Sequence, residues 1–298
     1  MADARAWLMQ KSAATVRYGD SLMFAGVDHP GPTSVHVPTR HGTVRCDVYH
    51  ADATDDAARR PPVYVHLHGG AFVMRRPEMD DFFARVVVAE VGATVVNVDY
   101  DVAPQRRYPV AQHQAHDVAA WVATRGHEQG WDGSRVAVGG FSAGGNLAAS
   151  ACLQARDRET FAPALQLLGV PSLDVAEPVA AKRSPLAHPM ISPPLLDLVR
   201  ATYYPDEDRR LEPYASPLLA PDLSRLPRAM VVTGELDALR REGDAYARRL
   251  VEAGVPTTHL VVPDRDHYFL DGERDRAQAR DVLHRVVAEM RDALGTDG

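Results

Sequence analysis

The sequence predicts an α/β fold with a mostly parallel central sheet and helices on both faces. Short apolar runs of strand length alternate with longer segments of helical periodicity between about residues 63 and 294. The apolar runs are nearly continuous, which is typical of strands that are covered on both faces. The 298 residues, of which 45% are hydrophobic, could form one large domain or two modest ones. We expect a single domain over residues 1–298.

The elements follow in order along the chain. Alternating apolar residues at 35–37 and 44–49 predict an antiparallel hairpin. Strands are expected at residues 63–67, 93–98, 135–138, 164–170, 228–234 and 257–262, of which the first two are expected to be buried. Helices are expected at residues 77–92, 110–125, 145–153, 240–252 and 279–294. The charged segment 51–62 predicts a surface loop, and residues 1–30, with apolar clusters at 7–9 and 22–25, predict short helical or irregular pieces.

One long segment breaks this rhythm. Residues 171–221 are rich in proline and hold a single short helical pattern, at 194–204. Long loops inside compact domains are usually functional, so we interpret this segment as an insertion that covers a site. Residues from about 1–32 and 176–213 are therefore expected to form a helical cap, although plain packing would equally explain the N-terminal part.

The strand at 135–138 leads into a Gly-x-Ser-x-Gly motif. Gly140, Ser142 and Gly144 are followed at once by an alanine-rich helical pattern, which is the strand, turn and helix of a nucleophile elbow. The strained turn would raise the Ser142 hydroxyl clear of the chain, and the glycines would leave room for strand and helix to pass closely. A glycine-rich turn with an ordinary N-cap serine is the structural alternative.

Two further residues complete a catalytic constellation. Ser142, Asp237 and His267 each lie just beyond a predicted parallel strand, in the order Ser, Asp, His. Loops after the carboxyl ends of such strands gather along one sheet edge. His267 would take the serine proton, and Asp237 would orient the imidazole. Glu235 and Asp264 are rival acids near Asp237.

A glycine-containing loop follows the strand at 63–67. The backbone N–H groups of Gly69, Gly70 and Ala71, together with that of Ala143, can be directed at a developing oxyanion. A tight turn between strand and helix is the alternative interpretation.

Composition limits the partners. The 33 basic and 40 acidic residues give a net charge of −7 and are scattered along the chain, so we expect neither nucleic acid nor an anionic membrane as a partner. Cys46 and Cys152 provide no disulfide framework or paired zinc spacing, and His113 and His116 lack neighbouring ligands, so no metal is expected. Without an apolar h-region or a stretch of membrane-span length, we expect a soluble cytoplasmic protein.

Several separated motifs together resemble the hormone-sensitive-lipase-like branch of the α/β-hydrolases, which includes bacterial carboxylesterases and acetyl esterases. The resemblance extends from about Val35 to the C-terminal helix. The matching segments are residues 68–72, 99–109, 140–148, 214–218 and 234–240, with His267 and Phe269. It implies hydrolysis of short- to medium-chain acyl esters through an acyl-enzyme, no cofactor, a small-molecule ester as partner and, by analogy, a homodimer. In this branch, Gly70 and Ala71 correspond to the usual oxyanion donors, together with Ala143.

The chain departs from the pattern of that branch at four positions. Phe141 replaces the acid usually found before the serine, Ala71 replaces a third glycine, Asp101 stands where arginine is common, and Ala238 replaces a proline. None of these removes a reacting group. Phe141 and Phe72 are expected to make the substrate pocket more apolar. An amidase or formamidase with the same triad, or a non-catalytic ligand-binding protein on this fold, are the alternative functions.

Overall fold

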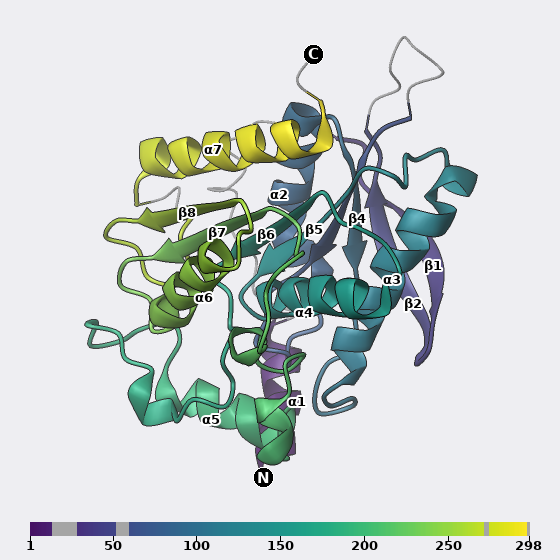
Figure 1. Cartoon of the computed structure of the whole chain (residues 1–298). Helices are drawn as coiled ribbons and strands as arrows, with labels where there is room; N and C mark the ends of the chain where they lie inside the picture. The colour runs from purple at the N-terminus through teal and green to yellow at the C-terminus, as the bar shows by residue number, and fades with distance from the viewer. Residues whose placement is uncertain (14–28, 52–59, 271–273, 297–298) are drawn as a thin grey trace.

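The computed structural model describes residues 1–13, 29–51, 60–270 and 274–296, and its centre is an eight-stranded sheet. The strand order is β1-β2-β4-β3-β5-β6-β7-β8 (Figure 1). The strands are β1 (Thr33–Thr39), β2 (Gly42–Tyr49), β3 (Val63–Leu67), β4 (Thr94–Val98), β5 (Val136–Phe141), β6 (Leu165–Gly169), β7 (Ala229–Gly234) and β8 (Thr257–Val262). β1 and β2 pair antiparallel, as do β2 and β4, and all later pairs are parallel. The predicted mostly parallel α/β sheet is confirmed.

Helices cover both faces of the sheet, as predicted (Figure 1). One face carries α2 (Asp81–Val86) and α7 (Arg276–Leu294), and the other carries α3 (Val110–Arg125), α4 (Ala143–Arg158) and α6 (Arg240–Glu252). α1 (Ala2–Ala13) and α5 (Pro193–Thr202) pack together beyond the sheet, at the lower end of Figure 1. Segments from the start and the middle of the chain thus meet at one end of the molecule.

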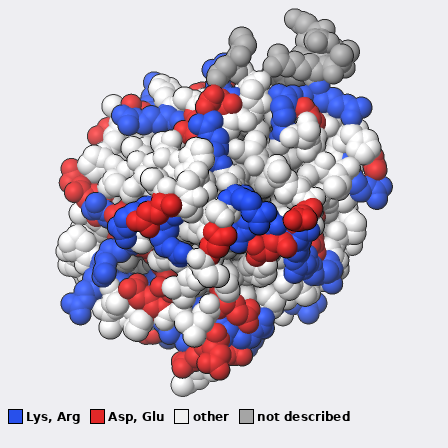
Figure 2. Space-filling view, viewed as in Figure 1, with Lys and Arg blue, Asp and Glu red and all other residues white. Residues whose placement is uncertain are grey.

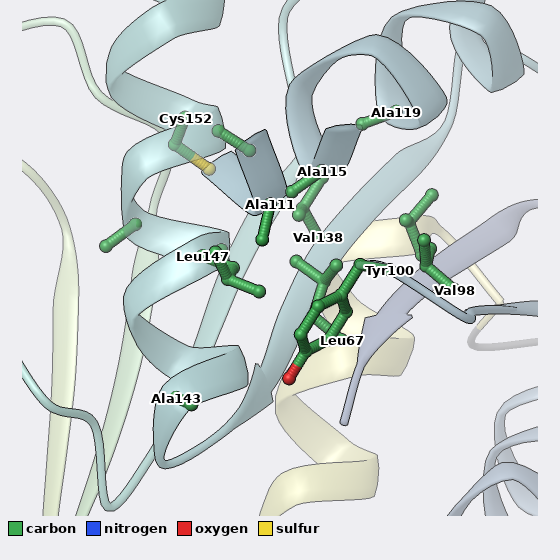
Figure 3. Close-up of a cluster of buried hydrophobic side chains, with 14 of the residues drawn as sticks. Leu67, Val98, Tyr100, Ala111, Ala115, Ala119, Val138, Ala143, Leu147 and Cys152 are labelled. Carbon is green, nitrogen blue, oxygen red and sulfur yellow. The ribbon is translucent and has the colours of Figure 1, made fainter. Parts of the chain in front are cut away.

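The two faces of the sheet bury separate apolar clusters. In β3, Val63, Val65 and Leu67 belong to the cluster under α3 and α4, whereas Tyr64 belongs to the cluster under α2 and α7. This alternation follows from the two-residue period of a strand. Figure 3 shows part of the first cluster, to which β3 contributes Leu67 and α3 contributes the short side chains of Ala111, Ala115 and Ala119. Both strand faces are buried, which explains why the sequence reads as continuous apolar runs.

Two expectations about local structure need correction. The segment 77–92 starts at Pro77 and closes at Gly92 as predicted, but it is not one regular helix. It consists of a 3₁₀ turn (Pro77–Asp80), α2, and a π-helical turn (Val87–Val91) that ends at Gly92 with a φ of 71°. The insertion also holds more than the one predicted helix, because three 3₁₀ turns accompany α5 (Val179–Ala181, Asp208–Leu211 and Pro217–Leu219). The expected apolar cluster at 22–25 and most of the loop at 51–62 lie outside the described residues.

Acidic and basic side chains are interspersed over the face seen in Figure 2, without a broad basic stripe. Cys46 and Cys152 are both buried and unpaired with each other. No helix in the described part of the chain has the length and hydropathy that crossing a membrane requires.

Candidate active site

Ser142 is the single residue between the end of β5 and the start of α4. Its backbone has a φ of 56° and a ψ of −113°, a conformation that side-chain-bearing residues seldom adopt. The Ser142 N–H donates to Gly169 O at 2.8 Å, which ties the turn to the neighbouring strand β6. The strained turn predicted from the Gly-x-Ser-x-Gly motif is therefore present.

The flanking glycines allow this turn to lie directly against β3. A Cβ atom on Gly140 would come 2.1 Å from Leu67 O, and one on Gly144 would come 1.8 Å from the same oxygen. Both contacts are far inside van der Waals distance and both involve backbone, which cannot give way easily. The glycines thus place Ser142 beside the loop that follows β3.

Asp237 and His267 meet at the carboxyl ends of β7 and β8. Asp237 Oδ2 lies 2.8 Å from His267 Nδ1, and both side chains are almost completely buried. Asp237 Oδ1 accepts the Leu239 N–H at 3.0 Å, so the carboxylate is held from a second side. The rival acid Glu235 instead accepts the Asp264 N–H at 2.9 Å. Of the acids weighed, Asp237 is the one that contacts the imidazole.

The loop after β3 has an unusual backbone. Gly70 has a φ of 118° and Ala71 a φ of 55°, and Gly70 O accepts the N–H groups of Val73 and Met74 at 3.0 and 2.8 Å. The N–H groups of Gly70, Ala71 and Ala143 donate a hydrogen bond to none of the described residues. Three backbone donors near Ser142 are thus available to a ligand.

The N–H of Gly69 was expected to be a fourth donor to the oxyanion, but it has another partner. Its N–H donates to Asp80 Oδ2 at 3.4 Å, so this group is directed at a side chain rather than left for a ligand. The difference arises because the 3₁₀ turn Pro77–Asp80 brings a carboxylate close to the loop.

His68 stabilises the same loop from inside the fold. Its Nδ1 lies 2.6 Å from Gly69 O, its ring stacks on Tyr100 with centroids 4.3 Å apart, and the Tyr100 hydroxyl donates to His68 O at 2.7 Å. Burial lowers the pKa of His68 to about 4, so the imidazole is neutral near pH 7 and Nδ1–H donates to Gly69 O. The loop is therefore fixed before any ligand arrives.

Ser142, His267 and the loop residues 69–71 line one cavity of about 290 Å³. Its walls combine the loop after β3, the elbow, the segment after β8, and side chains from α1 and the insertion. The lining residues include Met9, Gly69, Gly70, Ala71, Met74, Met79, Asp80, Phe82, Phe141, Ser142, Val170, Met190, Ile191, Leu195, His267, Tyr268, Phe269 and Leu270. Ser142 and His267 thus share a largely apolar cavity.

Only one of the two expected pocket phenylalanines lies there. Phe141 lines the cavity and packs against Phe83 and Phe269, with ring centroids 5.0 and 5.6 Å apart. Phe72 is outside the lining and is 2% exposed, because its ring stacks on Tyr203 with centroids 4.8 Å apart. The expectation that Phe72 faces the substrate was wrong.

Sequence reasoning missed a polar group in the cavity wall beside the loop after β3. Asp80 Oδ2 lies 3.0 Å from His66 Nε2, and His66 Nδ1 lies 3.1 Å from the Tyr64 hydroxyl. In the sequence, Asp80 resembles an ordinary acidic residue near a helix start, and His66 resembles a strand residue. No signal in the motifs connects them.

Metal-ligating side chains do not gather anywhere in residues 1–13, 29–51, 60–270 and 274–296, since no group of three or more His, Cys, Asp or Glu has the spacing to hold an ion. His113 stacks on His41 with ring centroids 5.1 Å apart. His116 contacts Thr160 and Asp117 at 2.9 and 3.0 Å. Both histidines therefore have partners within the fold.

Comparison with known proteins matches the chain to one family over most of its length. A family model described as alpha/beta hydrolase fold covers residues 64–271. An arylesterase of Saccharolobus solfataricus is 38% identical over 228 residues, which span 76% of this chain and 74% of that protein. An ethyl acetate hydrolase of Pseudomonas putida is 32% identical over 282 residues, covering 92% and 87% of the two chains.

The fold also agrees with solved structures. The esterase of Pyrobaculum calidifontis superimposes with a TM-score of 0.85 at 30% identity, covering 98% of this chain and 93% of that one. A thermostable esterase from Pseudomonas putida superimposes with a TM-score of 0.84 at 30% identity, covering 99% and 90%.

Proposed function

The chain belongs to the hormone-sensitive-lipase-like branch of the α/β-hydrolase family, and from this membership and the site geometry we propose that it is a serine carboxylesterase. The observation that supports the proposal most directly is the arrangement of three side chains. Ser142 projects from a strained elbow into the cavity that His267 also lines, and His267 is bound to Asp237 at 2.8 Å.

In the proposed reaction, Ser142 Oγ attacks the carbonyl carbon of the ester. A serine hydroxyl is too weakly acidic to ionise near neutral pH, so His267 Nε2 takes its proton as the C–O bond forms. In the structure, this nitrogen makes no hydrogen bond with any described residue, Ser142 included, so the lone pair is unoccupied and the transfer requires the two side chains to approach. Asp237 accepts the Nδ1–H, which fixes the tautomer and stabilises the imidazolium.

Attack converts the carbonyl oxygen to an oxyanion. The N–H groups of Gly70, Ala71 and Ala143 are the proposed donors to this oxygen, and Ala143 adds the positive end of the 16-residue helix α4. The loss of one such donor typically costs about 2.7–4 kcal/mol of activation free energy.

Collapse of the tetrahedral intermediate breaks the bond to the alcohol, which leaves with the proton from His267. The acyl group remains on Ser142 Oγ. Water then attacks this acyl-enzyme, with His267 as base, and a second collapse releases the carboxylic acid and restores the serine hydroxyl.

We propose short- to medium-chain acyl esters as substrates. The cavity of about 290 Å³ and its apolar walls suit an acyl chain of limited length. Met9 from α1, with Met190, Ile191 and Leu195 from the insertion, contributes to these walls, which supports a cap formed by residues from about 1–32 and 176–213. Two relatives carry the names arylesterase and ethyl acetate hydrolase, and the second name denotes an ester with a short acyl group.

The test is turnover of p-nitrophenyl esters of increasing acyl length, beside a matching aryl amide, with Ser142→Ala as the control. We expect ester hydrolysis with a maximum at a short or medium chain, and its loss in the variant. Preferential cleavage of the amide would replace the proposal with an amidase. Folded protein without activity on either series would leave a ligand-binding protein on this fold.

A further inference from the structure

Asp80 is the one acidic side chain among the described residues that line the cavity. The residue is 8% exposed and lines the cavity together with its neighbours Met79 and Phe82. A carboxylate is costly to place in an apolar cavity unless its oxygens are hydrogen-bonded. Its presence therefore calls for a functional or structural reason.

One oxygen of this carboxylate is fully engaged by the fold. Oδ2 lies 3.0 Å from His66 Nε2 and accepts the Gly69 N–H at 3.4 Å. His66 is completely buried and is held in turn by the Tyr64 hydroxyl at 3.1 Å from Nδ1. Burial raises the pKa of Tyr64 well above its ordinary value, so the hydroxyl keeps its proton and donates it to Nδ1. His66 Nε2–H then donates to Asp80, which fixes the orientation of the carboxylate.

The second oxygen has no such partner. Oδ1 accepts no hydrogen bond from any described residue, although the side chain is 11% exposed and belongs to the cavity wall. A carboxylate that is oriented through one oxygen and leaves the other accessible is an acceptor prepared for a donor that enters the cavity.

We propose that Asp80 is a specificity-determining residue that selects esters whose chain carries a hydroxyl group. The inference rests on the proposed esterase function and names the substrate class of the same cavity. A hydroxyl satisfies Oδ1, whereas a methyl group in the same place leaves the oxygen desolvated and unpaired.

A neutral donor suits the cavity better than an ammonium group. Asp80 already has the imidazole of His66 as a partner, and the other polar side chains described in the lining are those of Ser142, His267 and Tyr268. A second buried charge would need more acceptors than these walls supply.

The experiment compares p-nitrophenyl ω-hydroxyalkanoates with alkanoates in which a methyl group replaces the hydroxyl, over a series of chain lengths. A parallel series carries the hydroxyl or the methyl group on the alcohol part of the ester, and ω-ammonio esters of the same lengths test the charge of the donor. Hydrogen bonds to charged groups predict that the wild-type kcat/KM favours the hydroxyl by about 10–100-fold at the chain length that reaches Asp80. In Asp80→Asn, which keeps the shape but removes the charge, this ratio should fall about tenfold.

Asp81→Asn is the matched control. Asp81 is the next residue in the chain but lies outside the described lining, where it binds the Tyr49 hydroxyl and Arg85 at 2.7 and 2.6 Å. We expect this variant to keep the wild-type ratio. Because each ratio compares two substrates of one protein, partial unfolding of a variant does not change it.

A ratio near one at every length in both series, with the alkanoates still hydrolysed, would overturn the role of Asp80 and leave the esterase proposal intact. An equal fall in Asp81→Asn would also overturn it, and a preference for ω-ammonio esters would overturn the neutral donor. Absence of all ester hydrolysis would instead refute the esterase proposal itself.

Discussion

Replacing Asp237 with asparagine tests the proposed mechanism at the carboxylate that orients the imidazole of His267. Asp237 Oδ1 accepts the Leu239 N–H at 3.0 Å, so an asparagine keeps its oxygen on that side and turns its NH₂ group toward His267. The amide then donates to Nδ1, and the histidine proton moves to Nε2, the nitrogen that must accept the Ser142 proton. The Asp237 side chain is 1% exposed, so no bulk water offsets the change.

The expected loss in kcat is about 10⁴-fold, as for the corresponding change in other triads, or about 5 kcal/mol of activation free energy at 1.36 kcal/mol per tenfold. The assay is the initial rate on p-nitrophenyl butanoate, with thermal unfolding to show that the variant is folded. Glu235→Gln is the control, because Glu235 binds the Asp264 N–H instead of the imidazole. A fall of less than about tenfold in Asp237→Asn, or an equal fall in the control, would refute the assignment.

Three further predictions concern stability and selectivity. Burial raises the pKa of Glu242 from 4.5 to about 7, so its contribution to the free energy of unfolding is complete below pH 4.5 and is lost as the pH rises through 7. Urea unfolding across this range should show that the wild type loses stability relative to Glu242→Gln as the pH rises. If the free energies of unfolding of the two proteins change with pH in parallel, the prediction is wrong. In Gly169→Ala, the new Cβ would lie 2.4 Å from Phe141 Cδ1, so we expect the free energy of unfolding to fall by about 1–3 kcal/mol. Adding Phe141→Leu should restore part of this loss. If urea unfolding shows instead that the losses of the two single variants simply add in the double variant, this contact is not the cause. Phe141→Asp should shift the preferred acyl length while turnover continues, because Phe141 forms part of the cavity wall; an unchanged length profile would remove Phe141 from the determinants of selectivity.

The sequence predicted the parts of the site that depend on strand ends. Ser142 and Asp237 each follow a strand of buried, mostly apolar residues, and His267 follows the edge strand β8, which is largely exposed or half-buried. The parallel direction of these strands brings their carboxyl ends to one edge. Chain order and local periodicity are sufficient for this inference, because neither requires knowledge of side-chain contacts.

The remaining parts of the site depend on contacts between distant segments. Phe72 turns into the core because Tyr203, which follows α5 more than a hundred residues later, offers a stacking partner. Gly69 is withdrawn from the oxyanion donors by Asp80, which reaches it only because the 3₁₀ turn folds back under the loop. Local sequence carries no record of either contact, since both are set by tertiary packing.

The order of strands in the sheet has a consequence for how activity emerges during folding. The proposed nucleophile follows β5 near the middle of the sheet, whereas His267 follows β8, which pairs only with β7 at the edge. The three proposed catalytic side chains come together only when the pairs β5–β6, β6–β7 and β7–β8 have all formed, so hydrolysis cannot precede any of these pairings. Trp131 is buried beside Trp121 of α3, with ring centroids 6.3 Å apart, so its fluorescence reports the earlier part of the chain. On refolding, ester hydrolysis should therefore return no earlier than the tryptophan signal, and its return reports that the last strand has docked.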